Sequence, residues 1–481
     1  MTRDPGGGAN LSALRGHNAA LVLDLLRTAG EGGISRLELA ERTGLTPQAV
    51  SKITARLRAE GLAAEAGRRA STGGKPRTVL RLVPTAAHAV GVHLDRDELT
   101  LVLTDLTGAP VAVRHRPLTL ADGPAPVLAA VAEETRALLA RAGAAAPTGT
   151  AVRAGTAVRA GTAVRAGTAV RAGTVAPAAT VAPIGAHPGP APGPTGTSTG
   201  AGAVTPTGAE TVTPGTGAEV ASAGAEADGI VVLGVGVAMP GPLDHRLGVP
   251  GRVTGAPVWD GFPVREVLEA GLGLPVTLDK DTNAAALGLA VRPGAPRSFA
   301  YVHLGTGLGA GLVVGGAPLR GERTGAGELG HQTVQLDGPR CDCGARGCLE
   351  VLCLAAVARG ELPEAARILG TGAANLVRLL DIDRVLLGGR VVLGAPGVFA
   401  EGVSAVLADL RLPTPVEVTS GPHAVARGAA QLVLAPVFGL APPNHPSAYP
   451  PNHPSAYAPN HPQAYPPNHP SAYSSEDRTI R

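Results

Sequence analysis

The 481-residue chain lacks the features that mark membrane and secreted proteins. It contains no run of 18 apolar residues, and no apolar stretch follows Met1, so we expect a cytoplasmic protein without a membrane partner. The formal net charge of only +3 excludes a polycation. Lysine occurs only at Lys52, Lys75 and Lys280, and the heavy use of Arg, Ala, Gly and Pro is typical of a GC-rich coding sequence rather than of a function.

Large apolar side chains are almost absent from residues 144–228, where AVRAGT occurs four times in succession over residues 151–174. Ordering such a stretch costs more conformational entropy than its contacts return, so we predict a disordered insertion, with a six-residue solenoid as the alternative. Residues 440–481 carry four NHPxAY repeats, which predict a disordered, solvated polyproline-like tail. Weak metal binding or stacking on a partner is the alternative for that tail.

The remaining chain divides into three parts. Residues 1–83 hold 13 Lys and Arg against 7 Asp and Glu, an excess that suits a module facing nucleic acid. Within them, residues 10–83 have the pattern of short helices followed by a hairpin. Residues 84–143 alternate as strands do and end in an Ala- and Leu-rich helix, and residues 229–439 open on a second apolar run.

Two sequence patterns in the N-terminal module predict the starts of helices. Ser35 and Glu38 have the spacing of a capping box, and the helix they open is expected to turn Leu37 and Ala40 inward. Thr46 and Pro47 predict the cap and first residue of a second helix. A short helix, a glycine turn and a second helix with a polar start have helix-turn-helix spacing.

Two strands, residues 62–66 and 78–83, flank a basic glycine-rich tip and predict a wing. We expect Gln48 and Lys52 to read base edges, while the wing side chains approach phosphates or the minor groove. A small helical domain with a solvated basic loop is the alternative. The predicted DNA-binding residues are Thr46, Gln48, Ser51, Lys52, Arg56, Arg68, Arg69, Lys75 and Arg77.

The four cysteines fall within one stretch of thirteen residues, which fits metal ligation better than a disulfide framework. His331 precedes Cys341, Cys343 and Cys348, and this set of one histidine and three thiolates is typical of a closed, structural Zn²⁺ site. Free buried cysteines in a reducing cytosol are the alternative. Cys353 lies outside the pattern and is expected in the core.

The runs LRGHN, SRLELAERTGLTPQAVSKI and GGKPRTVLRLVP, which begin at residues 14, 35 and 73, resemble the amino-terminal domain of ROK-family repressors of xylose and N-acetylglucosamine genes. The His–Cys motif and Asp279-Lys-Asp-Thr-Asn283 resemble motifs of the same family. The resemblance implies an α/β fold: a winged helix-turn-helix followed by a two-lobed actin- or hexokinase-like domain.

In the family's kinases the residue matching Asp281 is the general base, and residues matching Asn283, Glu328, His331 and Glu350 contact the sugar. Residues 305–309, GTGLG, resemble the second phosphate loop, and glycines 388 and 389 sit where the family approaches adenosine. Each of these two glycine signals is weak alone.

Two departures from the family pattern stand out. His93 occupies the position of the Asp in the first phosphate loop, Asp-x-Gly-Gly-Thr, and Asp95, Arg96 and Asp97 replace Gly-Gly-Thr. No glycine remains to admit a phosphate and the new carboxylates would repel one, so we expect no enzyme activity and no catalytic residue. Lys280 replaces a sugar-binding Asn, which favours an acidic or phosphorylated sugar unless the lysine faces solvent.

The sequence therefore predicts a DNA-binding regulator, a repressor, of carbohydrate-metabolism genes. A sugar or sugar derivative would bind between the lobes and change the affinity for a double-stranded operator. We expect a homodimer or higher homo-oligomer, because two-fold symmetry matches a palindromic site. The alternatives are an ATP-dependent sugar kinase that carries a DNA module, and a ligand-independent DNA-binding protein with a decayed pocket.

Overall fold

A computed structural model describes the chain in several stretches. They are residues 11–69, 77–145, 226–227, 230–419, 421 and 423–440. The predicted insertion and tail lie almost entirely outside them. Among the helices of the described stretches, none is both long and apolar enough to cross a membrane.

The N-terminal residues fold as a winged helix with a three-stranded sheet in the order β1-β3-β2. The Ser35 hydroxyl accepts a hydrogen bond from the Glu38 amide at 3.3 Å, and the Glu38 carboxylate accepts one from the Ser35 amide at 2.8 Å, which confirms the capping box. Thr46 caps the next helix, again as predicted. The elements are α1 (Leu11–Ala29), η1 (Gly30–Gly32), β1 (Ile34–Ser35), α2 (Arg36–Thr43), α3 (Pro47–Ala59), β2 (Ala63–Arg69) and β3 (Arg77–Leu82).

Of the two side chains predicted to face inward on α2, Ala40 is confirmed and the prediction for Leu37 is wrong. Leu37 is 42% exposed, whereas Leu39 and Ala40 are buried. The face of α2 that carries Leu39 and Ala40 shares a core with Val50 of α3, and Leu37 lies on a different face of the helix.

The body contains two mixed sheets with the same strand arrangement. In each, three consecutive antiparallel strands are followed by two parallel ones, which gives the orders β11-β8-β4-β5-β6 and β14-β13-β12-β15-β16. This repeated α/β sheet confirms the predicted fold class. The strands are β4 (His88–Leu94), β5 (Glu98–Asp105), β6 (Pro110–Pro117), β8 (Ile230–Met239) and β11 (Val276–Lys280) in the first sheet, and β12 (Phe299–Leu304), β13 (Leu308–Val314), β14 (Ala317–Pro318), β15 (Arg384–Gly388) and β16 (Val416–Val418) in the second.

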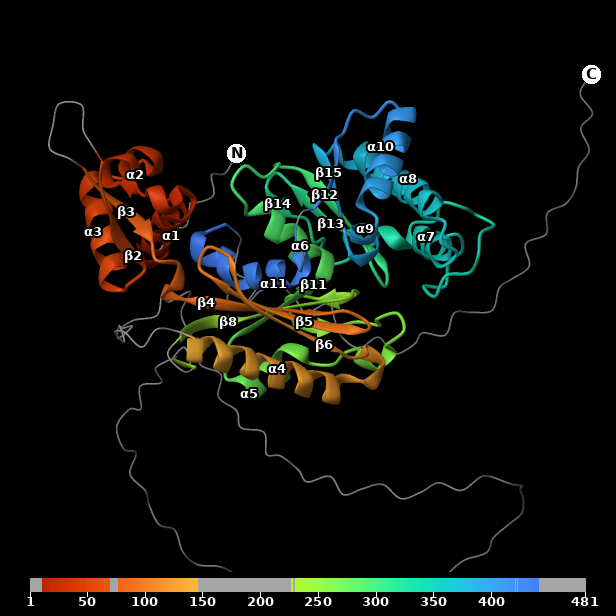
Figure 1. The fold of residues 1–481 in the computed structure, drawn as a ribbon, viewed down its shortest axis with the longest axis horizontal. Helices are drawn as coiled ribbons and strands as arrows, with labels where there is room; N and C mark the ends of the chain where they lie inside the picture. Colours follow the sequence, from red (N-terminus) through yellow and green to blue (C-terminus); the bar gives the residue numbers. More distant parts are fainter. Residues whose placement is uncertain are drawn as a thin grey trace, which may run out of the picture. The chain divides into compact units, whose positions relative to one another are not determined.

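Helices cover each sheet. On the first, α4 (Pro124–Ala145) and α5 (Val264–Leu272) lie along one face, where Val92 of β4 shares a core with Val131 and Leu268 (Figure 1). On the second, Val302 of β12 shares a core with Phe399. Its helices are α7 (Leu349–Ala358), α8 (Leu362–Leu380), α9 (Arg390–Gly394) and α10 (Pro396–Asp409).

Two helices, α6 (Asp281–Ala290) and α11 (Ala424–Leu434), pack on each other and share a core with residues from both sheets. Glycines permit this close packing. A Cβ on Gly428 would lie 2.0 Å from the carbonyl oxygen of Ala284, and one on Gly91 would lie 1.8 Å from that of Ala426. A larger residue at either position would push α11 off its neighbours.

Short elements complete the described chain. They are β7 (Glu226–Ala227), β9 (Leu243–Asp244), β10 (Val249–Pro250), η2 (Pro84–Ala86), η3 (Leu120–Asp122), η4 (Pro257–Trp259), η5 (Leu329–His331) and η6 (Ala435–Phe438).

Candidate functional site

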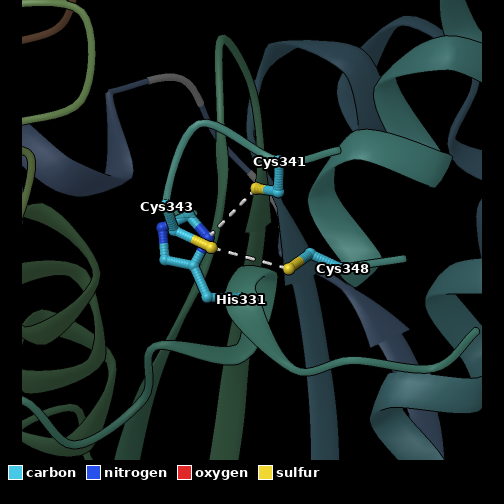
Figure 2. Close-up of side chains that lie close together, drawn as sticks. All are labelled: His331, Cys341, Cys343 and Cys348. Atoms are coloured by element: carbon cyan, nitrogen blue, oxygen red, sulfur yellow. Dashed lines mark hydrogen bonds between the residues drawn. The ribbon is translucent and has the colours of Figure 1, made fainter. Parts of the chain in front are cut away.

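His331, Cys341, Cys343 and Cys348 converge on one point (Figure 2). Their ligand atoms all lie within 4.8 Å of one another. The sulfur atoms of Cys343 and Cys348 are 3.6 Å apart, and Cys341 Sγ lies 3.7 Å from His331 Nδ1. With Zn–S bonds near 2.3 Å and Zn–N bonds near 2.05 Å, a tetrahedral zinc would place two sulfurs about 3.8 Å apart and a sulfur and a nitrogen about 3.6 Å apart. The four side chains fit that geometry.

The local sequence makes this convergence possible. His331 ends η5, and Cys348 directly precedes α7. Between them Gly347 has a φ of 58°, and a Cβ there would lie 1.7 Å from the carbonyl oxygen of Gln335. Only glycine therefore allows the loop to fold back. Cys353 does not belong to this cluster. It is a buried residue of α7, and its thiol donates a hydrogen bond to the Ala365 carbonyl.

Asp281 stands at the first position of α6, directly after β11. Burial raises the pKa of its carboxyl to about 7, and the charges of Asp95 and Glu328 add to the rise while Lys280 opposes it. The carboxylate accepts a hydrogen bond from the Thr282 amide at 2.6 Å. A carboxyl with a pKa near neutrality is suited to accept or hold a proton from a hydroxyl group.

Lys280 faces the protein interior rather than solvent. Its side chain is only 4% exposed, and its Nζ donates hydrogen bonds to Glu328 Oε1 at 2.9 Å and to the Ala326 carbonyl at 2.6 Å. The Gly241 turn closes over this ion pair, since a Cβ there would lie within 3.0 Å of both side chains. Glu328, whose side chain is 38% exposed, is therefore already partnered within the chain.

The other predicted sugar-facing residues also have internal partners. Asn283 is fully buried and donates its amide to Asp279 Oδ1 at 3.1 Å, while its own oxygen has no partner among the described residues. Arg320 pairs with the same aspartate at 2.7 Å. Glu350, buried at the start of α7, accepts a hydrogen bond from the Leu308 amide at 2.8 Å. The structure thus brings Asp281 and Glu328 together, and sets Glu350 beside the second glycine loop.

The segment after β4 contacts the second glycine loop directly. Thr306 donates its hydroxyl to Asp95 Oδ1 at 2.6 Å, and Arg96 donates to the Thr306 carbonyl at 3.4 Å. Arg390, at the start of α9, donates two hydrogen bonds to the Asp97 carboxylate at 2.7 and 3.1 Å. Asp95, Arg96 and Asp97 are therefore all engaged in contacts with Thr306 or Arg390.

Two histidines lie beneath these contacts. Burial lowers the pKa of His93, and burial together with the charge of His93 lowers that of His303 to about 4. Both rings are therefore neutral at neutral pH, and their centroids are 6.5 Å apart. Burial alone would raise the pKa of Asp95, but its electrostatic interaction with His93 and the hydrogen bonds from the Thr306 hydroxyl and the Arg96 amide outweigh burial, so the net effect is a lowered pKa.

The predicted DNA-facing side chains of α3 lie on its exposed surface. Gln48, Ser51, Lys52 and Arg56 are exposed there, and Arg56 also pairs with Glu60 at 3.6 Å. In the wing, Arg68 and Arg77 are exposed and Arg69 belongs to β2, whereas Lys75 lies outside the described residues.

Sequence reasoning missed several members of these clusters. Arg390 directly follows the flagged glycines 388 and 389, but an arginine after a glycine pair carries no signal of an ion pair with Asp97. Arg320, His303 and Tyr301 were missed for the same reason, because only the folded chain brings them near Asp279, Asp95 and Asp281 respectively.

The fold and these motifs define a winged helix joined to a sugar-kinase-like body. The profile of the ROK family matches residues 203–360, and that of winged helix-turn-helix DNA-binding domains matches residues 22–63. The chain belongs to the ROK family.

The chain is similar both to sugar kinases and to repressors of this family. Kanosamine kinase of Amycolatopsis mediterranei is 33% identical over 235 residues, which cover 41% of this chain and 76% of the kinase. The xylose repressor of Caldicellulosiruptor bescii is 36% identical over 123 residues, 25% of this chain and 30% of the repressor. The chain thus matches less than a third of that repressor's length. The crystal structure of a ROK family transcriptional regulator, a homologue of the Escherichia coli MLC protein, has a TM-score of 0.59 at 19% identity and covers 89% of this chain and 98% of its own.

Proposed function

We propose that this chain is a transcriptional regulator, a repressor of carbohydrate-metabolism genes, and that it has no kinase activity. The lack of kinase activity is inferred from the contacts of Asp95 with Thr306 and of Asp97 with Arg390. In a phosphoryl-transfer enzyme this place must admit a triphosphate and Mg²⁺. Here Thr306 holds Asp95 and Arg390 holds Asp97, so a nucleotide would have to break a hydrogen bond and an ion pair to enter.

The DNA half of the proposal rests on α3. Thr46 caps the helix, so that its exposed first turns can enter a major groove with Gln48 and Lys52 at base edges and Ser51 and Arg56 nearer the backbone. In the wing, Arg68, Arg69, Lys75 and Arg77 would neutralise phosphates. Residues 10–83 would form this DNA-binding domain.

The effector half rests on the polar side chains around Asp281. A sugar hydroxyl could exchange hydrogen bonds with Asp281 and Glu328, while His331 and Glu350 hold the neighbouring loop and α7 in place. Asn283 would act through Asp279, which it contacts directly. Because Lys280 is buried and paired with Glu328, an anionic group of the ligand would reach this cation only by displacing that pair. Residues 84–143 and 229–439 would form this sensing domain.

The His–Cys cluster would hold a structural Zn²⁺ through His331, Cys341, Cys343 and Cys348. The distances between their ligand atoms and the soft thiolate donors support zinc. The ion would fix the loop that follows Glu328 and the start of α7, which carries Glu350. We further propose a cytoplasmic homodimer or higher homo-oligomer, in which paired winged helices match a two-fold operator.

Selection of bound fragments from genomic DNA by the full-length protein tests the regulator proposal. Selected fragments are expected to share a palindromic site, and gel shifts with a panel of neutral, amino and acidic sugars are expected to show one class that changes the affinity. Recovery of no shared site would contradict the proposal. Intact operator binding without any response to a sugar would instead favour a ligand-independent DNA-binding protein.

The rival function is an ATP-dependent sugar kinase, favoured by the neutral-range pKa of Asp281. A coupled ADP-release assay with the same sugars separates the two. Turnover of about 1 s⁻¹ or more, within the usual range of enzymes, would overturn our ranking.

A further inference from the structure

A pocket of about 80 Å³ lies toward the opposite end of α6 from Asp281. Its walls come from the C-terminal end of α6 and the residues after it, the N-terminal half of α11, the turn at Thr107 and Gly108, and Arg27 of α1. None of the residues assigned above to the metal cluster, the predicted sugar site or the DNA-facing surface lines it. One water occupies about 30 Å³ in the liquid, so the pocket has room for a small tetrahedral anion.

The lining of this pocket has charge of one sign. Arg27, Arg292 and Arg427 contribute to it, and no aspartate or glutamate does. Arg27 is committed elsewhere, because it pairs with Asp24 at 2.6 Å and its guanidinium lies 5.3 Å from the centre of the Phe438 ring. Among the residues that the structure describes, no carboxylate forms an ion pair with Arg292 or Arg427.

Arg292 and Arg427, which lack a carboxylate partner among the described residues, repel each other electrostatically. Arg292 keeps an exposed part, but the burial of the rest lowers its pKa, and the charge of Arg427 lowers it further. His423, the residue before α11, also feels the charge of Arg427. Like charges held at a pocket without a counter-charge destabilise the folded chain, and an anion placed between them would remove that cost.

The start of α11 adds to the positive potential. Ala424, Arg427 and Gly428 line the pocket from the first turns of this eleven-residue helix. Its capping residue, His423, makes no side-chain hydrogen bond to the first amides. Helix N-termini favour anions, and arginine guanidinium groups suit the oxygens of phosphate.

We propose that this pocket binds a phosphate group, either as inorganic phosphate or as a phosphate monoester, through Arg292 and Arg427. The site is independent of the effector site and of the metal cluster. Because Arg27 belongs to the first helix of the winged helix, the bound anion would sit where α1 meets α6 and α11 of the body. The proposal does not depend on the regulator function.

Titration calorimetry of the full-length protein with inorganic phosphate tests this site, at ionic strength held constant with sodium chloride. Wild-type protein is expected to bind one phosphate saturably. Arg292→Gln and Arg427→Gln are each expected to weaken binding at least tenfold, and the double variant to abolish it. Arg297→Gln is the matched control, because Arg297 is an exposed arginine a few residues along the same connection whose side chain donates to the Gly315 carbonyl and does not line the pocket. It should bind as wild type does.

Hexose 6-phosphates in the same titration distinguish the two sources of the group: tighter binding than inorganic phosphate identifies a monoester site, and equal or weaker binding identifies a phosphate site. Arg427→Lys keeps the charge without the planar fork and should retain part of the affinity, which guards against loss of fold in Arg427→Gln. Absence of saturable binding to wild type would overturn the proposal. Equal weakening of phosphate binding by Arg297→Gln would also overturn it. If Arg292→Gln and Arg427→Gln weakened only the binding of DNA, the two arginines would instead be contacts for the nucleic-acid backbone, and the proposal would be wrong.

Discussion

Arg390 donates two hydrogen bonds, of 2.7 and 3.1 Å, to the carboxylate of Asp97, and so connects the turn after β4 to the start of α9. Both side chains are about half exposed, so the pair is expected to contribute no more than about 1 kcal/mol to stability. Under the proposed function its consequence is steric, because the pair would lie where a kinase of this family admits a nucleotide.

Restoring the loop tests this relationship. Wild-type protein is expected to show no binding of Mg²⁺-ATP. The variant His93→Asp, Asp95→Gly, Arg96→Gly, Asp97→Thr rebuilds the Asp-x-Gly-Gly-Thr sequence and should gain binding measurable by calorimetry. His93→Asp alone is the control and should gain none, because both carboxylates remain. Equal ATP affinity in wild type and the rebuilt variant would show that the contacts do not exclude nucleotide.

Asp281 should make stability fall as pH rises. Burial raises the pKa of this carboxyl to about 7 in the folded chain, so that between about pH 4 and pH 7 the folded state holds a proton that the unfolded state has released. Asp281→Asn removes this penalty. The variant should be more stable than wild type at pH 8, by up to about 4 kcal/mol for three pKa units, and the difference should vanish near pH 4.

Urea denaturation at pH 4, 6 and 8 measures this difference. Asp260→Asn, at an exposed aspartate outside the site, provides the control and should follow wild type at every pH. A constant offset between Asp281→Asn and wild type across the three pH values would rule out titration of this carboxyl as the cause.

The Lys280–Glu328 pair should respond asymmetrically to mutation. Glu328→Gln leaves a buried ammonium group without its counter-charge, retaining only the Ala326 carbonyl, and is expected to cost about 2 kcal/mol or more. Lys280→Met keeps the packing and leaves a carboxylate that water can reach, so it should cost less than about 1 kcal/mol. Thermal unfolding of both variants decides the matter, and equal losses would show that Lys280 needs no partner.

Zinc content provides a direct test of the metal cluster. Purified wild-type protein is expected to carry one Zn²⁺ per chain by elemental analysis, and Cys348→Ser to carry less than half of that. Cys353→Ala is the matched control, because it removes a buried thiol from the same helix without touching the cluster. Loss of metal in both variants, or in neither, would contradict the assignment of ligands.

The sequence was sufficient where function depends on local spacing. The capping box at Ser35, the cap at Thr46 and the convergence of His331 with three cysteines all lie within short segments, so their geometry follows from residues that are close along the chain. It failed for contacts across the fold: Arg390 lies 293 residues after Asp97, and no pattern linked them. Lys280 was ambiguous for the same reason, since its burial depends on the Gly241 turn and on Glu328.

The central claim is that α3 of the winged helix binds an operator. Fluorescence anisotropy on a selected operator, at several salt concentrations, tests it with the full-length protein. Gln48→Ala and Lys52→Ala are each expected to weaken specific binding by about 1–3 kcal/mol, roughly 5- to 150-fold. Arg141→Ala, at an exposed arginine of α4, should leave the affinity unchanged. Equal affinities for wild type and both α3 variants would contradict the claim.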